Sequence, residues 1–207
     1  MNDLSAKYSM RLEQALVPLA SRLQSHLIGC LKGIARIDRI SVRAKTLHSF
    51  LKKAAKEDEA NNLKYRDPLN QIQDQLGARI TALYVQDVEA ICDRVPNYLH
   101  AIEQRIVVPD SQSKFGYFGR HFIFLLPSDI KGDGISEDQH PPYFELQVKT
   151  VFQHAWAEAE HDLAYKVTAP LTPEQERKVA FTSAQAWGAD EMFRQLAGEI
   201  PSVLTSN

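Results

Sequence analysis

The chain has 207 residues, of which 44% are hydrophobic and 24% charged, and its formal net charge is −2. This length can bury the core of one α/β domain. The near-neutral charge argues against bulk electrostatic binding to nucleic acid or anionic lipid, although it allows a local basic pocket. No apolar run approaches the ~20 residues that span a bilayer, and no secretory signal opens the sequence. Since Cys30 and Cys92 also lack disulfide or metal spacing, we expect a cytoplasmic protein without a membrane partner.

The first third of the chain predicts a helix, a strand and a second helix. Leucines at three-to-four spacing indicate an amphipathic helix over about residues 4–31, with Pro18 as a kink or break. Alternating residues over 35–45 predict a half-buried strand. Residues 46–58 predict a helix with Thr46 as its N-cap, and the polar stretch 57–70 predicts a loop.

Three further strands and three further helices are expected in the rest of the chain. The strands cover 77–85, 120–127 and 142–150, and the Gly/Asp/Pro-rich stretch 127–142 should be an exposed loop. The helices cover 88–104, with an interruption near Pro96, and then 150–166 and 174–200. Strands mixed with helices in no regular rhythm favour an α+β or mixed α/β fold over a doubly wound sheet. The terminal helices are amphipathic enough to pack on the core or on a second subunit.

A basic group marks the end of the first strand and the helix that follows. Arg43 and Lys45 are two residues apart on a strand and should share a face, and Lys53 lies one turn beyond Ser49 on the helix. The helix N-terminus also favours anions, so this group could neutralise a polyphosphate. The spacing alone is equally typical of a solvated edge strand and a charged helix face.

Carboxylates on two strands could ligate a metal. Asp74 precedes the strand that carries Arg79, and Glu145, Gln147 and Lys149 alternate with apolar residues on a later strand. Mg²⁺ takes one or two carboxylates and completes its shell with water and phosphates, and Glu145 could also accept a proton from a hydroxyl nucleophile. The ordinary alternatives are a capping Asp, a surface Arg and a solvent-facing sheet.

Two other elements have weaker signals. Gly116 and Gly119 bracket Tyr117, whose ring could stack on a purine, although a turn with a half-buried Tyr has the same pattern. His154, Glu158 and His161 share one helical face, but their order matches no zinc motif, so surface pairing or site support is the better interpretation.

The order of these elements is similar to the synthetase domain of the RelA/SpoT family over about residues 40–166. The matching patterns are R-x-K-x-x-x-S-x-x-x-K (Arg43, Lys45, Ser49, Lys53), D-x-x-x-x-R (Asp74, Arg79), GY-x-x-x-H (Gly116, Tyr117, His121) and E-x-Q-x-[RK]-T (Glu145, Gln147, Lys149, Thr150). The stretch from Gln153 to Lys166 looks like that of stand-alone members. The resemblance implies one synthetase domain over 1–207, with a helical segment at 1–35, a catalytic core at 36–166 and a C-terminal helix at 167–207.

The resemblance also implies an activity and residue roles. The fold would be a nucleotidyltransferase-like mixed sheet with flanking helices. The reaction would transfer the β,γ-pyrophosphate of ATP to the 3′-hydroxyl of GDP or GTP, making (p)ppGpp. By position, the ATP-binding residues would be Arg43, Lys45, Ser49, Lys53 and Arg79. Asp74 and Glu145 would be catalytic and would hold Mg²⁺, and the acceptor would bind Lys114, Tyr117, His121, Gln147 and Lys149.

Two departures from the family pattern flank the acceptor pocket. Many members have K-x-N-G-Y, whereas this chain has Lys114 one residue later and Phe115 in place of the asparagine. Residues 118–120 also differ from the commoner pattern. The alternatives are therefore a toxic relative that modifies adenosine nucleotides or the 3′ end of tRNA, with a neutralising antitoxin protein, and an inactive nucleotide-binding module. Since no hydrolase segment precedes the match, we expect a small stand-alone synthetase without alarmone-degrading activity.

Overall fold

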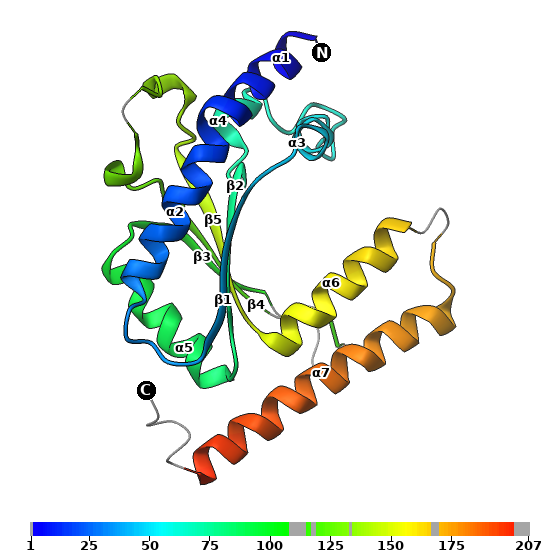
Figure 1. Cartoon of the computed structure of the whole chain (residues 1–207). Helices are drawn as coiled ribbons and strands as arrows, with labels where there is room; N and C mark the ends of the chain where they lie inside the picture. Colours follow the sequence, from blue (N-terminus) through cyan, green and yellow to red (C-terminus); the bar gives the residue numbers. More distant parts are fainter. Residues whose placement is uncertain (1, 108–114, 117–118, 133, 167–169, 201–207) are drawn as a thin grey trace.

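The computed structural model describes residues 2–107, 115–116, 119–132, 134–166 and 170–200. These residues form a mixed α+β fold, as the sequence predicts, around a five-stranded sheet that has one strand more than expected (Figure 1). The strands are β1 (Ile37–Ala44), β2 (Leu76–Ala82), β3 (Ala101–Val107), β4 (Gly119–Leu125) and β5 (Tyr143–Thr150), in the order β1-β2-β5-β4-β3. β2 and β5 are parallel, and the other neighbouring pairs are antiparallel.

The helices are α1 (Asn2–Arg11), α2 (Val17–Cys30), α3 (Leu47–Ala54), the single turn α4 (Pro68–Gln71), α5 (Val85–Arg94), α6 (Val151–Lys166) and α7 (Pro173–Glu199). Figure 1 shows α2 and α5 on one side of the sheet and α3 and α6 on the other, with α7 running alongside α6. None of the helices among the described residues has the length and apolar character that crossing a bilayer requires.

The even-numbered residues of the central strands form the hydrophobic core. Ile80, Phe122 and Leu146 are almost fully buried, and the rings of Phe124 and Phe144 stack 5.6 Å apart. The leucines of α2 pack onto this face and are also fully buried, as the three-to-four spacing requires. The opposite, odd-numbered face is therefore left for polar side chains.

Three expectations about local structure need correction. The helix does not break at Pro18, because a π-helical segment (Leu12–Leu16) precedes the proline and the chain continues directly into α2. In this segment the Val17 N–H bonds to the Leu12 carbonyl, five residues back, and the helical path continues although Pro18 has no N–H to donate. Residues 101–104, expected at the end of a helix, begin the edge strand β3, whose mostly exposed residues give no clear alternation. Finally, stretch 127–142 is only partly exposed, because Ile130 and His140 are buried.

Most other boundaries agree with the sequence, but the helix predicted over 46–58 ends at Ala54 and the loop predicted over 57–70 includes the start of α4. Thr46 caps α3 as expected, with its hydroxyl accepting a hydrogen bond from the Ser49 amide at 3.3 Å. The predicted strand 77–85 ends earlier, at Ala82, because Tyr84 already caps α5. α6 and α7 match their predicted ranges within one residue at each end.

Candidate active site

The strand register aligns the predicted site residues on the odd-numbered face of the sheet. Arg43, Gly77 and Glu145 are partners across β1, β2 and β5, and Arg79 is level with Gln147, which in turn pairs with His121 on β4. Residues side by side in a sheet point to the same face. The result is a cavity of about 470 Å³ that this face lines together with the start of α3 and with His161 of α6.

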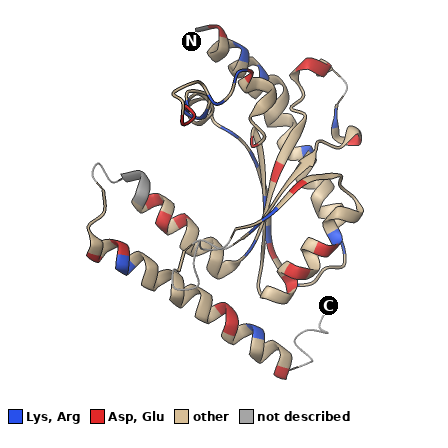
Figure 2. Cartoon of the chain, turned by 180° about the vertical axis from the view of Figure 1, so that it is seen from behind, with Lys and Arg blue, Asp and Glu red and all other residues tan. Residues whose placement is uncertain are grey.

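The cavity brings together most of the residues predicted for ATP and metal. Its lining includes Arg43, Lys45, Ser49, Asp74, Arg79, Glu145 and Gln147. Asp74 and Glu145 therefore border one space together with Arg43 and Lys45, although they come from different parts of the chain. Figure 2 shows Lys and Arg along β1 and around α3, whereas the described part of α6 is acidic.

Asp74 lies between two of the predicted ATP-binding lysines. Its Oδ2 is 2.9 Å from Nζ of Lys45, and its Oδ1 is 3.0 Å from Nζ of Lys53. Burial raises the pKa of Asp74, but the charges and hydrogen bonds of the two lysines outweigh burial, so its pKa lies below the ordinary value. Asp74 is therefore ionised at neutral pH.

Glu145 is held by its neighbours on the same sheet face. Its Oε1 is 3.1 Å from Nδ1 of His121, and its Oε2 accepts a hydrogen bond of 3.3 Å from Nε2 of Gln147. Burial raises the pKa of Glu145, and the charge of Asp74 raises it too. The contacts with His121 and Gln147 lower the pKa by more than these two effects raise it, so the net shift is downward. An ionised carboxylate in this position can accept a proton.

Arg79 connects the sheet to α6. Its Nη1 donates to Oε1 of Glu158 at 2.6 Å and lies 3.2 Å from Nδ1 of His154. Its Nε is buried and has no hydrogen-bond partner among the described residues. Buried donors are rarely left unpaired in proteins, so this one indicates a place where a ligand oxygen belongs. His154 and Glu158 thus support the site, as their helical spacing suggested.

Lys149 lies deeper on the same strand face. It is almost completely buried and is level with Thr81 of β2. Burial, reinforced by the charge of Arg79, lowers the pKa of Lys149 to about 8. A lysine with this pKa is only partly charged at slightly alkaline pH.

The predicted acceptor residues are described in part. Lys114 and Tyr117 lie outside the described residues, but Phe115 and Gly116 beside them are described. The Gly116 carbonyl accepts a hydrogen bond of 2.7 Å from the Ser183 hydroxyl of α7, and the Phe115 ring lies 5.9 Å from the Trp187 ring. The sequence did not indicate that α7 holds this segment.

Two other lining residues were missed from the sequence. Ser41 of β1 faces the cavity, and Gly77 lies in register between Arg43 and Glu145. A Cβ added at Gly77 would meet nothing within 4 Å, so any side chain there would extend into the open space of the cavity. Gly77 lies near the start of the buried strand β2, three residues after Asp74. A glycine inside a strand often marks a place where a ligand or another backbone comes close, so the sequence did contain a signal for this residue.

The donor set fits a magnesium ion. Asp74 and Glu145 are both ionised and border one cavity, and Mg²⁺ is typically held by one or two carboxylates together with substrate phosphates and water. The described residues contain no group of three or more His, Cys, Asp or Glu that could hold a metal by itself.

Comparison with known proteins identifies the family of the chain. The sequence pattern described as "Region found in RelA / SpoT proteins" matches residues 42–169, which include every predicted site residue. The chain belongs to the RelA/SpoT family. It is similar to the GTP pyrophosphokinase YjbM of Bacillus subtilis, with 25% identity over 169 residues that cover 79% of this chain and 74% of the relative.

Solved structures of this family share the fold. The small alarmone synthetase 1 from Bacillus subtilis superimposes with a TM-score of 0.75 at 23% identity, covering 93% of this chain and 99% of that chain. The same synthetase bound to its product pppGpp gives a TM-score of 0.71 at 22% identity, covering 94% and 97%. The mixed sheet with flanking helices is therefore the fold of stand-alone RelA/SpoT-family synthetases.

Proposed function

We propose that this chain transfers the β,γ-pyrophosphate of ATP to the 3′-hydroxyl of GDP or GTP and so makes (p)ppGpp. The observation that supports this most is the single cavity in which two ionised carboxylates lie beside a group of cations. Membership of the RelA/SpoT family and the similarity to a protein named GTP pyrophosphokinase support a pyrophosphokinase-type enzyme.

In this proposal the triphosphate of ATP binds near α3, at the end of β1 that leads into this helix. Arg43, Lys45, Lys53 and Arg79 supply positive charge, and Ser49 with the first turn of α3 supplies hydrogen-bond donors. The unpaired Nε of Arg79 is available for a phosphate oxygen. Phosphoryl-type transfer depends mainly on positioning and charge neutralisation, and this arrangement provides both.

Asp74 and Glu145 would hold Mg²⁺, which would neutralise charge that develops on the transferred group. Glu145 would also take the proton from the 3′-hydroxyl while the hydroxyl oxygen bonds to the β-phosphorus of ATP. The bond from the β-phosphorus to the bridging oxygen would break, and AMP would leave with that oxygen. The hydrogen bond from Gln147 and the contact with His121 would orient the Glu145 carboxylate for this role.

The acceptor would bind on the same face of the sheet, along β4 and β5. His121, Gln147 and Lys149 would approach its sugar and phosphates, and Lys114 and Tyr117 would contact its phosphates and base. Phe115 occupies the place of the usual asparagine, and its ring lies 5.9 Å from the Trp187 ring, so an apolar side chain stands where the family pattern has an amide. The acceptors that separate the alternatives are therefore GDP and GTP, adenosine nucleotides, and deacylated tRNA.

An acceptor assay tests the proposal. The protein is incubated with Mg²⁺, ATP labelled in its β- or γ-phosphate, and one acceptor at a time. We expect label on GDP and GTP. Label only on tRNA, which would indicate a toxic synthetase and an antitoxin partner, or only on adenosine nucleotides, would overturn the choice of acceptor.

A second test addresses catalysis itself. Glu145→Gln keeps the shape of the side chain but removes its charge and basicity, so it should abolish transfer while ATP binding remains. Unchanged turnover would exclude Glu145 from the mechanism. Absence of transfer to any acceptor by the wild-type protein, with ATP binding intact, would favour an inactive nucleotide-binding module.

A further inference from the structure

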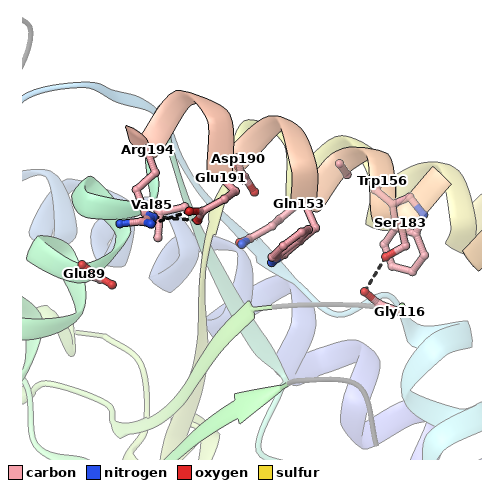
Figure 3. Close-up of a pocket in the computed structure, with 11 residues that line it drawn as sticks. Val85, Glu89, Gly116, Gln153, Trp156, Ser183, Asp190, Glu191 and Arg194 are labelled. Carbon is pink, nitrogen blue, oxygen red and sulfur yellow. Dashed lines mark hydrogen bonds and ion pairs between the residues drawn. The ribbon is translucent and has the colours of Figure 1, made fainter. Parts of the chain in front are cut away.

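A second cavity lies between α5, α6 and α7. Its volume is about 420 Å³, and it shares no lining residue with the candidate active site. Figure 3 shows Asp190 and Glu191 on α7 with Gln153 below Asp190, and Trp156 beside Ser183 toward the end of the cavity that Gly116 borders. No role proposed above for ATP, metal or catalysis uses this cavity, although Ser183 and Trp187 of its lining contact Gly116 and Phe115 beside the acceptor residues.

Asp190 is the unusual residue of this cavity. It is only 4% exposed, and its Oδ2 accepts a hydrogen bond of 2.7 Å from the Thr150 hydroxyl. Its Oδ1 is buried and has no hydrogen-bond partner among the described residues. Burial raises the pKa of Asp190 to about 6 and the Thr150 hydroxyl lowers it, so most molecules carry a charge here at neutral pH. A buried carboxylate with one unpaired oxygen is costly unless another group compensates it.

The other charges around the cavity do not supply that compensation. Glu89 and Glu191 are also in its lining, and Arg194 is the only cation among the described lining residues. Nε of Arg194 donates to Oε2 of Glu191 at 2.7 Å, so its charge is already balanced. The described lining is therefore negative overall, which opposes a phosphate-bearing ligand and favours a cation.

The walls of the cavity suit an organic cation better than a hydrated metal ion. Trp156 and Trp187 both line it, and the faces of tryptophan rings attract ammonium and guanidinium groups. The Trp156 ring is oriented by a hydrogen bond of 3.1 Å from its Nε1 to the Thr182 hydroxyl, and the Trp187 ring packs near Phe115. A strongly hydrated divalent cation would find one carboxylate oxygen without a partner among the described residues and two apolar rings, which is a poor coordination shell.

We propose that this cavity binds a small organic cation bearing a primary amine or a guanidinium group. One N–H of the ligand donates to Oδ1 of Asp190, and the alkyl or planar part of the ligand packs between Trp156 and Trp187. Because Gly116 also borders the cavity, the ligand would lie against the segment that precedes Tyr117. The proposal does not depend on the pyrophosphokinase activity.

The chain offers a specific spectroscopic probe for this site. It contains two tryptophans, and both line the cavity, so intrinsic tryptophan fluorescence reports on it selectively. We would titrate the full chain at pH 7.5 with putrescine, agmatine and spermidine, and with 1,4-butanediol as a neutral analogue of putrescine. Calorimetry under the same conditions gives the dissociation constants independently.

Asp190→Asn is the test variant and Glu176→Gln the control, since Glu176 is an exposed acid of the same helix outside the cavity. The asparagine keeps the shape and can still accept from Thr150, so we expect a folded protein, and its thermal unfolding curve checks this. We expect saturable binding of at least one amine or guanidine, a loss of about tenfold or more in Asp190→Asn, as for a charge-assisted hydrogen bond, and an unchanged constant in Glu176→Gln.

Several results would overturn the proposal. They are the absence of saturable binding of all three cations in the millimolar range, equal binding of 1,4-butanediol, or equal binding by Asp190→Asn. Equal weakening in Glu176→Gln would show that the cations respond to the general acidity of α7 and not to this cavity. If Asp190→Asn unfolds, Trp187→Leu replaces it, because it removes an aromatic wall at a half-exposed position and should also weaken binding.

Discussion

Asp74→Asn should separate ATP binding from pyrophosphate transfer. In the structure one carboxylate holds two lysines that the proposed triphosphate site needs, at 2.9 and 3.0 Å. The substitution releases Lys45 and Lys53 and removes a negative charge from the cavity. Because each such pair is worth about 0.5–1 kcal/mol when partly exposed, ATP should bind about 5- to 30-fold more tightly in the absence of divalent metal. Transfer should nevertheless fall by at least about 100-fold, because a proposed metal ligand is lost.

The same substitution has a cost in stability. The side chains of Asp74, Lys45 and Lys53 are 20%, 19% and 29% exposed, between the surface and buried extremes. Leaving two lysines without their carboxylate should lower the free energy of unfolding by about 1–3 kcal/mol. A non-transferable ATP analogue should recover more stability in Asp74→Asn than in the wild type when metal is chelated.

Calorimetry with this analogue in EDTA, thermal unfolding, and the transfer assay in Mg²⁺ measure the three quantities. Asp38→Asn, an exposed position of β1 outside the cavity, is the matched control. Unchanged or weaker analogue binding in EDTA would refute the idea that Asp74 competes with phosphate for the lysines. Transfer close to the wild-type rate would remove Asp74 from the metal site.

Three further predictions concern residues around the candidate active site. Glu158→Gln should lower the KM for ATP about two- to fivefold in steady-state kinetics, because Arg79 no longer has to leave an exposed ion pair; a higher KM would contradict this. Ser183→Ala removes the hydrogen bond to the segment before Tyr117 and should raise the acceptor KM about fivefold with the ATP KM unchanged; equal effects on both would indicate a general structural role. Lys149 has a pKa of about 8 in the folded chain and an ordinary pKa of about 10.4 in the unfolded chain. Between these two pH values the unfolded chain binds more protons than the folded chain, so the free energy of unfolding rises with pH. Denaturant unfolding of Lys149→Met should lack this increase, and an identical increase in the variant would assign it to other groups.

The pattern of the sequence was sufficient where a residue's role depends on its own strand or helix. The alternation around Glu145 predicted that Glu145, Gln147 and Lys149 share one face, and β5 has that arrangement. Thr46 was recognisable as a cap because the hydrogen bond it accepts comes from three residues away. Such features depend on local geometry that the residue types determine.

Contacts between distant segments could not be derived in this way. The order β1-β2-β5-β4-β3 decides that Glu145 lies beside Gly77 and Ile123, and nothing in the individual strands specifies that order. β3 was mistaken for a helix end because an edge strand with exposed residues on both faces lacks the alternation that burial imposes. The bond from Ser183 to Gly116 joins residues 67 apart, so only the packed structure reveals it.

The pairing of charges in the candidate site has a consequence for how it selects its ligand. Lys45 and Lys53 are bound to Asp74, and Arg79 is bound to Glu158, so much of the positive charge is already neutralised before ATP arrives. In the binding mode proposed above, free ATP would have to displace these carboxylates, and its own charge would then face Asp74 and Glu145 at close range. A divalent cation that arrives with ATP removes this conflict, because the carboxylates can turn to the metal while the released cations turn to the phosphates. Binding of ATP and binding of metal should then be strongly coupled. The paired cations and carboxylates would therefore discriminate metal-bound from metal-free nucleotide.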